Sequence, residues 1–265
     1  MIRKPLALIL VLLVAHFATA HDTWLQPNTH IVRVGDAIHL DVMLGNHGNE
    51  HRDFKLAGKA DLESSKLTLF TPDNKTLDLK PTLTDQGLAP KEGYFTTRFV
   101  PSAPGLHLLA CASDKVVSYA PTRSIHSAKT FFLASKSLDN PPADVPGFDR
   151  VLKHALELVP KSNPVAPMGP GSKISVQLLF QGKPLADARI AFIPRGVTLA
   201  ENFDPKYERK TDSSGLATFE PPDGNYYLIA AHHADPNAKG EGYTSTKYSA
   251  TLTVLVPNTC PCCGE

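Results

Sequence analysis

The chain lacks an excess of charge of either sign. Its 265 residues include 27 lysines and arginines against 26 aspartates and glutamates, a formal net charge of +1. This balance provides no long-range field that would attract nucleic acid or an anionic membrane surface. We therefore expect neither of them as a partner.

Long hydrophobic runs are also absent beyond the start of the chain, where residues 6–14 are all apolar. A stable transmembrane helix needs about 20 apolar residues, so direct membrane insertion is not expected. A basic pair precedes this run, and Ala18-Thr19-Ala20 follows it with the small-residue spacing that signal peptidase accepts. The pattern predicts a signal peptide over residues 1–20 and a periplasmic or secreted protein that begins at His21.

Cysteine is scarce and unevenly placed. Cys111 lies in the body of the chain, whereas Cys260, Cys262 and Cys263 lie close together near residue 265. A secreted disulfide framework needs paired cysteines at scattered spacings, so we expect none here. The Cys-rich tail, residues 258–265, offers thiolates that suit Cu(I) or Zn(II). A mixed disulfide, an intermolecular cross-link and a tail without a role are the alternatives.

Common catalytic signatures are missing as well. The sequence contains no Gly-rich phosphate loop, no nucleophile elbow, no helical HxxxH motif and no paired CxxC motifs. Carboxylates such as Asp187 and Asp212 fall in expected turns, where aspartate is favoured because it bonds to the backbone. The sequence therefore predicts no enzymatic activity.

Proline, glycine and short alternating runs favour an all-β fold. The chain has 23 prolines and 17 glycines, and many short segments alternate apolar with polar residues, as half-buried strands do. Turn residues separate these segments, which is typical of antiparallel β-sandwiches. The expected strands are 38–44, 66–70, 94–100, 106–112 and 129–134 in the first half, and 173–180, 188–193, 216–219, 226–231 and 248–256 in the second.

A proline-rich break at residues 139–142 separates the two halves. The apolar residues from Phe148 to Val159 that follow have helical spacing, and Pro160 would end a helix there. We predict a short amphipathic helix over 148–159. The predicted architecture is two immunoglobulin-like antiparallel β-sandwich domains, 21–138 and 164–257, joined by the helix-containing linker 139–163.

Several segments resemble a known family. They are HDTWLQP at 21–27, LELVPKSNP at 156–164, PGSKISVQLLFQGKPLADARIAF at 170–192, TDSSGLATF at 211–219, YLIAAHH at 227–233 and YSATLTVLV at 248–256. Together they resemble domain-of-unknown-function family 4198, periplasmic proteins often labelled as associated with nickel or cobalt uptake. The resemblance implies a periplasmic metal-handling or accessory protein. The transmembrane role in that label does not carry over, because no membrane segment follows the leader.

The expected mature N terminus offers nitrogen donors for a metal ion. After cleavage, His21 would carry an imidazole and a free α-amino group, whose pKa of about 7.7–8.0 lets a cation displace its proton near neutrality. Such ligands suit nickel, cobalt, copper and zinc. One residue is an incomplete site, so His47, His232 and His126 are the candidate partners. The resembled family tends to place histidines at the first two of these, and each could instead be an ordinary solvated histidine.

These observations together predict a transition-metal-binding accessory protein. It would buffer nickel, cobalt or copper, or deliver the ion to a membrane transporter. One alternative is a metal-free cell-envelope binding or adhesion module, since paired immunoglobulin-like domains often present loops to a partner. The other is a copper oxygenase, which would need a second histidine and an axial tyrosine or phenylalanine beside His21.

Overall fold

The predicted all-β class is confirmed. The computed structural model describes residues 21–47, 56–87, 92–117, 119–165 and 169–258, and within these ranges the chain forms strands and one 3-10 turn, η1 (Lys80–Thr82). The predicted signal peptide and Cys260, Cys262 and Cys263 lie outside the described residues. The strands belong to three sheets.

The first outer sheet is built from the N-terminal part of the chain. It has five strands in the order β1-β3-β8-β7, with β4 paired to β3 as well. The pairs are antiparallel throughout. The strands are β1 (Asp22–Pro27), β3 (Ile38–Gly45), β4 (Leu56–Gly58), β7 (Thr84–Asp85) and β8 (Phe95–Phe99).

The central sheet takes strands from both halves of the chain. It has nine strands in the order β15-β14-β17-β18-β10-β9-β5-β6, with β2 paired to β10. β10 pairs in parallel with β18 and with β2, whereas the other pairs of this sheet are antiparallel. The strands are β2 (Ile31–Arg33), β5 (Ser65–Phe70), β6 (Thr76–Asp78), β9 (Gly105–Val116), β10 (Thr122–Ser135), β14 (Arg189–Pro194), β15 (Glu208–Lys210), β17 (Asn225–Asp235) and β18 (Ser245–Val256).

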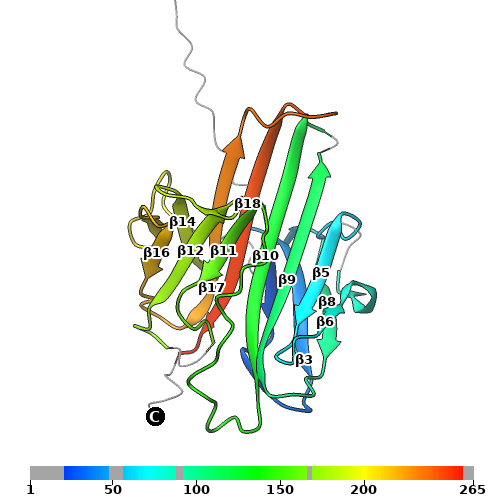
Figure 1. Ribbon diagram of the computed structural model, residues 1–265, viewed down its shortest axis with the longest axis vertical. Helices are drawn as coiled ribbons and strands as arrows, with labels where there is room; N and C mark the ends of the chain where they lie inside the picture. The colour runs from blue at the N-terminus through cyan, green and yellow to red at the C-terminus, as the bar shows by residue number, and fades with distance from the viewer. Residues whose placement is uncertain (1–20, 48–55, 88–91, 118, 166–168, 259–265) are drawn as a thin grey trace, which may run out of the picture.

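The second outer sheet has four antiparallel strands, with β12 paired to each of the other three. In Figure 1, β12 and β16 lie on one side of the long central strands β10 and β18, and β3 and β8 lie on the other. The strands are β11 (Leu156–Pro160), β12 (Ile174–Phe180), β13 (Lys183–Pro184) and β16 (Leu216–Phe219).

The central sheet separates two hydrophobic cores, and β10 contributes to both. Phe132 and Ala134 pack with residues of the first outer sheet, such as Leu40. Phe131 and Leu133, which point the other way, pack with residues of the second outer sheet. Successive side chains of a strand face opposite sides of the sheet, so the alternation along β10 serves a three-layered molecule with a shared middle layer.

The predicted helix over 148–159 is wrong. Leu156–Pro160 is instead the buried strand β11, and the residues from 148 to 155 that precede it are not helical. The cause is Glu157, whose carboxylate accepts hydrogen bonds from the backbone N–H groups of Leu152 (2.6 Å) and His154 (3.1 Å). Lys129 of β10 holds the same carboxylate inside the molecule, 2.5 Å from its Nζ, with both side chains almost fully buried. The apolar residues that suggested a helical stripe still pack on the core, but from an irregular segment.

The shared sheet changes how the two predicted sandwiches are connected. β10 from the first half and β18 from the second pair over nine residues in the middle of the molecule. The strand β1 also bonds to the second half, because Thr251 Oγ1 donates to the carbonyl of Thr23 (2.8 Å). The halves therefore join through sheet pairing as well as through the linker, and the division at 139–163 stays a prediction. No helix among the described residues is long and apolar enough to span a membrane.

Candidate functional site

A row of polar residues crosses the central sheet on the face that the first outer sheet covers. His126 of β10 and His232 of β17 both align with Ser249 of β18, which lies between them. Residues aligned across neighbouring strands point to the same face, and neighbouring strands are about 4.8 Å apart. The two imidazoles therefore flank one serine, and we call His126, Ser249 and His232 the histidine row.

The histidine row lies where β1 begins. The Asp22 carboxylate is 2.8 Å from His232 Nε2, so it accepts the proton of that ring nitrogen. The Asp22 side chain is 10% exposed, whereas that of His232 is 50% exposed. At this end of the first outer sheet, a buried carboxylate therefore contacts a half-exposed imidazole. The histidine row lies at the edge of the area that the first outer sheet covers, and we call this edge the rim.

Asp22 fixes the chemical form of His232. Burial disfavours the charged ring, but the attraction and the hydrogen bond of Asp22 outweigh it and raise the pKa of His232 above its ordinary value of 6.5. In the neutral ring the same bond keeps the proton on Nε2 and leaves the lone pair of Nδ1 for a ligand. Metal-binding histidines usually donate their other ring N–H to a carboxylate or another acceptor, because this hydrogen bond orients the ring and makes it more basic.

His126 is held as a neutral ring between two hydroxyls. Its Nε2 is 2.7 Å from Ser124 Oγ, and its Nδ1 is 2.5 Å from Ser249 Oγ. Burial lowers the pKa of His126 below 6.5, and Lys115 and His232 lower it further against the opposing attraction of Asp22. Neutral imidazole is the form that binds metal ions. A metal would have to displace one hydroxyl to reach the ring.

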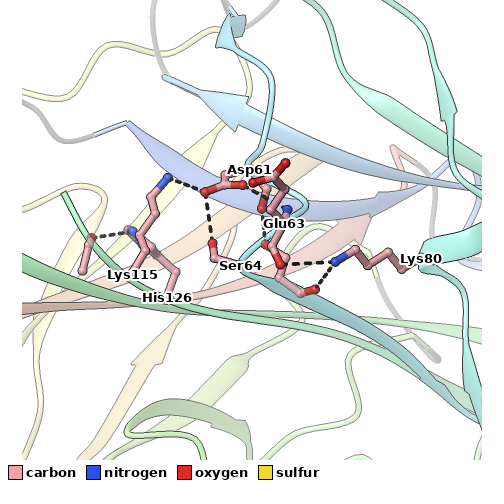
Figure 2. A network of polar contacts seen from close by, with 8 residues as sticks. Asp61, Glu63, Ser64, Lys80, Lys115 and His126 are labelled. Atoms are coloured by element: carbon pink, nitrogen blue, oxygen red, sulfur yellow. Dashed lines mark hydrogen bonds and ion pairs between the residues drawn. The ribbon is translucent and has the colours of Figure 1, made fainter. Parts of the chain in front are cut away.

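A bound lysine lies beside His126. Lys115 Nζ is 3.0 Å from Asp61 Oδ2, and Figure 2 shows the Lys115 and His126 side chains next to each other. Hydrogen bonding from Lys115 lowers the pKa of Asp61. Lys80 Nζ bonds to the carbonyls of Glu63 and Ser65, which anchors the turn that carries Asp61. The charge next to the histidine row is therefore compensated and fixed in place.

The structure brings two of the four predicted ligands together. His126 and His232 share the histidine row, and His21 is an exposed residue directly before Asp22. Within the ranges that the structure describes, no three His, Cys, Asp or Glu side chains are already arranged to hold a metal ion. A metal site would therefore need His21 and His126 to move toward His232.

His47, the remaining predicted ligand, has a structural environment. The residue is 2% exposed; its ring packs edge-on against Trp24 with centroids 5.5 Å apart, and Nδ1 bonds to the carbonyl of Ile193 (3.1 Å). Burial, with a contribution from Arg195, lowers the pKa of His47 to about 3. A neutral ring packed in this way stabilises the contact between the outer and central sheets.

Sequence reasoning missed the residues that support the two histidines. Asp22 is next to His21 in the sequence, but its partner His232 is 210 positions away. Ser249 and Lys115 likewise reach the site only through strand pairing. A single serine or aspartate in a strand cannot be recognised as part of a site from the sequence, because its neighbours depend on how the strands pair.

Comparison with known proteins identifies a family. The family described as "Domain of unknown function (DUF4198)" matches residues 18–235, and no curated protein matches the chain. The D0-D1 domain of intimin is 10% identical with a TM-score of 0.23, over 89% of this chain and 98% of that one. A DUF4785 family protein from Legionella pneumophila is 11% identical with a TM-score of 0.26, over 78% of this chain and 51% of that one.

A third solved structure, Salmonella alpha-2-macroglobulin reacted with methylamine, is 12% identical with a TM-score of 0.25, over 89% of this chain and 15% of that one. Structural likeness at this level carries no conclusion about function. The family match is of a different kind, because it extends over most of the sequence and includes Asp22, His126 and His232. The chain belongs to the DUF4198 family.

Proposed function

We propose that the protein binds a transition-metal ion at the histidine row and acts as a periplasmic accessory protein that buffers the ion or delivers it to a membrane partner. The observation that carries this proposal is His232, whose Nε2 is held by the buried Asp22 carboxylate while its ring is half exposed. A carboxylate that accepts the N–H of an imidazole in this way orients the ring and makes its other nitrogen a better metal ligand.

Three residues supply the donors in this proposal. His232 provides Nδ1, and His126 provides the nitrogen that one serine releases. His21 contributes its imidazole and, once the leader is removed, its α-amino group. A set of nitrogen donors suits nickel, cobalt, copper or zinc. Because His21 is exposed and adjoins Asp22, binding would draw the N terminus onto the rim.

Isothermal titration of the mature chain tests the proposal. We expect the chain that begins at His21 to bind Ni²⁺ or Cu²⁺ with a Kd in the micromolar range or tighter. A chain with one glycine added before His21 separates the α-amine from the imidazole, and it should bind at least about tenfold more weakly, comparable to the loss of one supporting group.

Histidine variants locate the site. His126→Ala and His232→Ala should each weaken binding by about tenfold or more. His39→Ala is the matched control, because His39 is an exposed histidine near the start of β3, and it should leave the affinity unchanged. Binding no tighter than millimolar by the chain that begins at His21 would refute the proposal and favour a metal-free envelope-binding module.

A further inference from the structure

Next to the histidine row, the same face of the central sheet carries a second polar row with two lysines. Ser124 of β10 aligns with Lys115 of β9 on one side and with Lys247 of β18 on the other, and Lys247 aligns with Ala234 of β17. On each strand, the residue of this second row lies two positions along the chain from the residue in or beside the histidine row, as Lys247 does from Ser249. The two rows are therefore about 7 Å apart on one face.

The two lysines differ in what they are free to bind. Lys115 is engaged by Asp61. Lys247 is exposed, and it has no ion-pair partner among the residues that the structure describes. Its flexible four-carbon stem ends in a compact charge with three donors, and that stem is long enough to reach across the gap between the rows. Lys247 is thus an available cation beside the proposed metal ligands.

Two of the described carboxylates beside the site already have partners. Asp22 is bonded to His232, and Asp61 is bonded to Lys115. A bare divalent ion at the histidine row would meet the repulsion of Lys247, whose charge no ion pair among the described residues neutralises. An ion that arrives with an anionic ligand avoids this cost, because a carboxylate on that ligand can bond to the lysine.

We propose that the histidine row accepts the metal as a complex with a small polycarboxylate chelator, one carboxylate of which binds Lys247. This inference rests on the proposed function and adds the chemical class of the substrate. The imidazoles recognise the metal, and the lysine recognises the part of the chelator that the metal does not use. Because the histidine row and the row that carries Lys247 lie side by side on one face of the sheet, a single metal–chelator complex can contact the imidazoles and the lysine together.

Citrate is the probe, and calorimetry compares two titrations of the mature chain: Ni²⁺ alone and the preformed 1:1 nickel–citrate complex. Lys247→Ala should weaken binding of the complex about two- to fivefold, the range for one exposed ion pair, and Lys247→Glu about tenfold. Binding of Ni²⁺ alone should be unchanged or slightly tighter in both variants. Lys183→Ala is the control, since Lys183 is an exposed strand lysine of the second outer sheet.

The outcomes separate the two proposals. Weaker binding of the complex to both Lys247 variants, with normal binding to the Lys183 variant, supports the inference. If Ni²⁺ binds but its citrate complex does not, or binds the Lys247 variants as well as the unaltered chain, the inference is overturned and the proposed function stands. If neither form binds, the proposed function itself fails.

Discussion

Among single side chains, Asp22 has the most direct effect on the chemistry of the rim. Its carboxylate holds the pKa of His232 above 6.5 despite burial. Stabilisation from such a group is fully present below the unfolded-state pKa and is lost as the pH rises through the raised folded-state pKa. The contact therefore contributes most to stability in mild acid.

Asp22→Asn removes the charge but keeps a hydrogen-bond acceptor. The loss of unfolding free energy relative to the unaltered protein should be larger at pH 5.5 than at pH 8.5, by no more than about 1 kcal/mol, because solvent screens the half-exposed ring. Urea unfolding at the two pH values measures this. Asp36→Asn, on an exposed turn, is the control, and an equal loss at both pH values for Asp22→Asn would contradict the prediction.

His47 should respond to pH in the opposite way. Its folded-state pKa of about 3 lies below the unfolded value of 6.5, so the unfolded chain binds the extra proton and stability falls as the pH drops below 6.5. At pH 5 this effect is about 2 kcal/mol, since each pKa unit corresponds to about 1.36 kcal/mol.

His47→Asn should reduce that pH dependence. It should also lower the unfolding free energy at pH 7 by about 2 kcal/mol, through lost packing against Trp24, and leave metal affinity unchanged. Urea unfolding at pH 7 and pH 5, with calorimetry of Ni²⁺ binding, measures these effects. A tenfold loss of metal affinity in a folded variant would show that His47 is a ligand after all.

The sequence identified histidines but could not assign their surroundings. In the sequence alone, His47, His126 and His232 all occur at polar or strand-end positions, so their burial and partners could not be distinguished. Their roles differ because one ring is buried against Trp24 and the others lie on an open row. That difference depends on which sheet covers each strand.

At the level of elements, alternation of polarity located strands well wherever one face is solvated or the turns are clear. β3, β5, β8, β12 and β17 overlap their predicted ranges. β10 shows the limit, because it begins at Thr122, before the predicted start at Lys129, and is buried on both faces along its second half. Each face of this half packs on a different core, so residues 131–134 are apolar on both faces and the alternation is lost.

The wrong helix has a specific physical origin. The spacing of apolar residues from Phe148 onward suits a helix, and several of them do pack on the core. The competing interaction is the buried carboxylate of Glu157, which bonds two backbone N–H groups and Lys129. Lys129 and Glu157 are 28 positions apart, so local periodicity could not reveal their contact.

Lys153 offers a test of this segment, because its φ of 64° lies in the left-handed region. Glycine adopts that conformation without strain, so Lys153→Gly should raise the unfolding free energy by about 0.5–1 kcal/mol. In a helix the same change would lower it by about 1 kcal/mol. Urea unfolding measures whether the unfolding free energy rises or falls. A fall would contradict the irregular segment and support the predicted helix.

Across the whole molecule, the two halves are interlocked by long-range pairing. Thr130 Oγ1 donates to the carbonyl of Thr253, 123 positions away, where β10 and β18 run in parallel. Sequence patterns indicate which residues form strands but not which strands pair. The β-rich class was therefore predictable, and the shared middle sheet was not.

Separate expression of the two predicted domains tests this architecture. The 164–257 fragment lacks β9, β10 and β11, which supply Leu106, Phe131, Leu156 and neighbouring residues to its core. We expect this fragment to show little amide dispersion by NMR, while the intact chain from 21 to 257 unfolds in urea in one transition. An independently folded 164–257 fragment would confirm the predicted domain boundary and contradict the interdependence of the halves.

The parallel pairing of β10 with β18 also sets an order of events during synthesis. Until the ribosome has made the residues up to Val256, the part of β10 from Thr122 to Thr130 has an unsatisfied backbone edge, because β2 pairs only with Leu133–Ser135 on that side. Unpaired apolar strands in incomplete chains are prone to aggregate. The middle sheet therefore cannot be completed until β18 has been synthesised, near the end of translation.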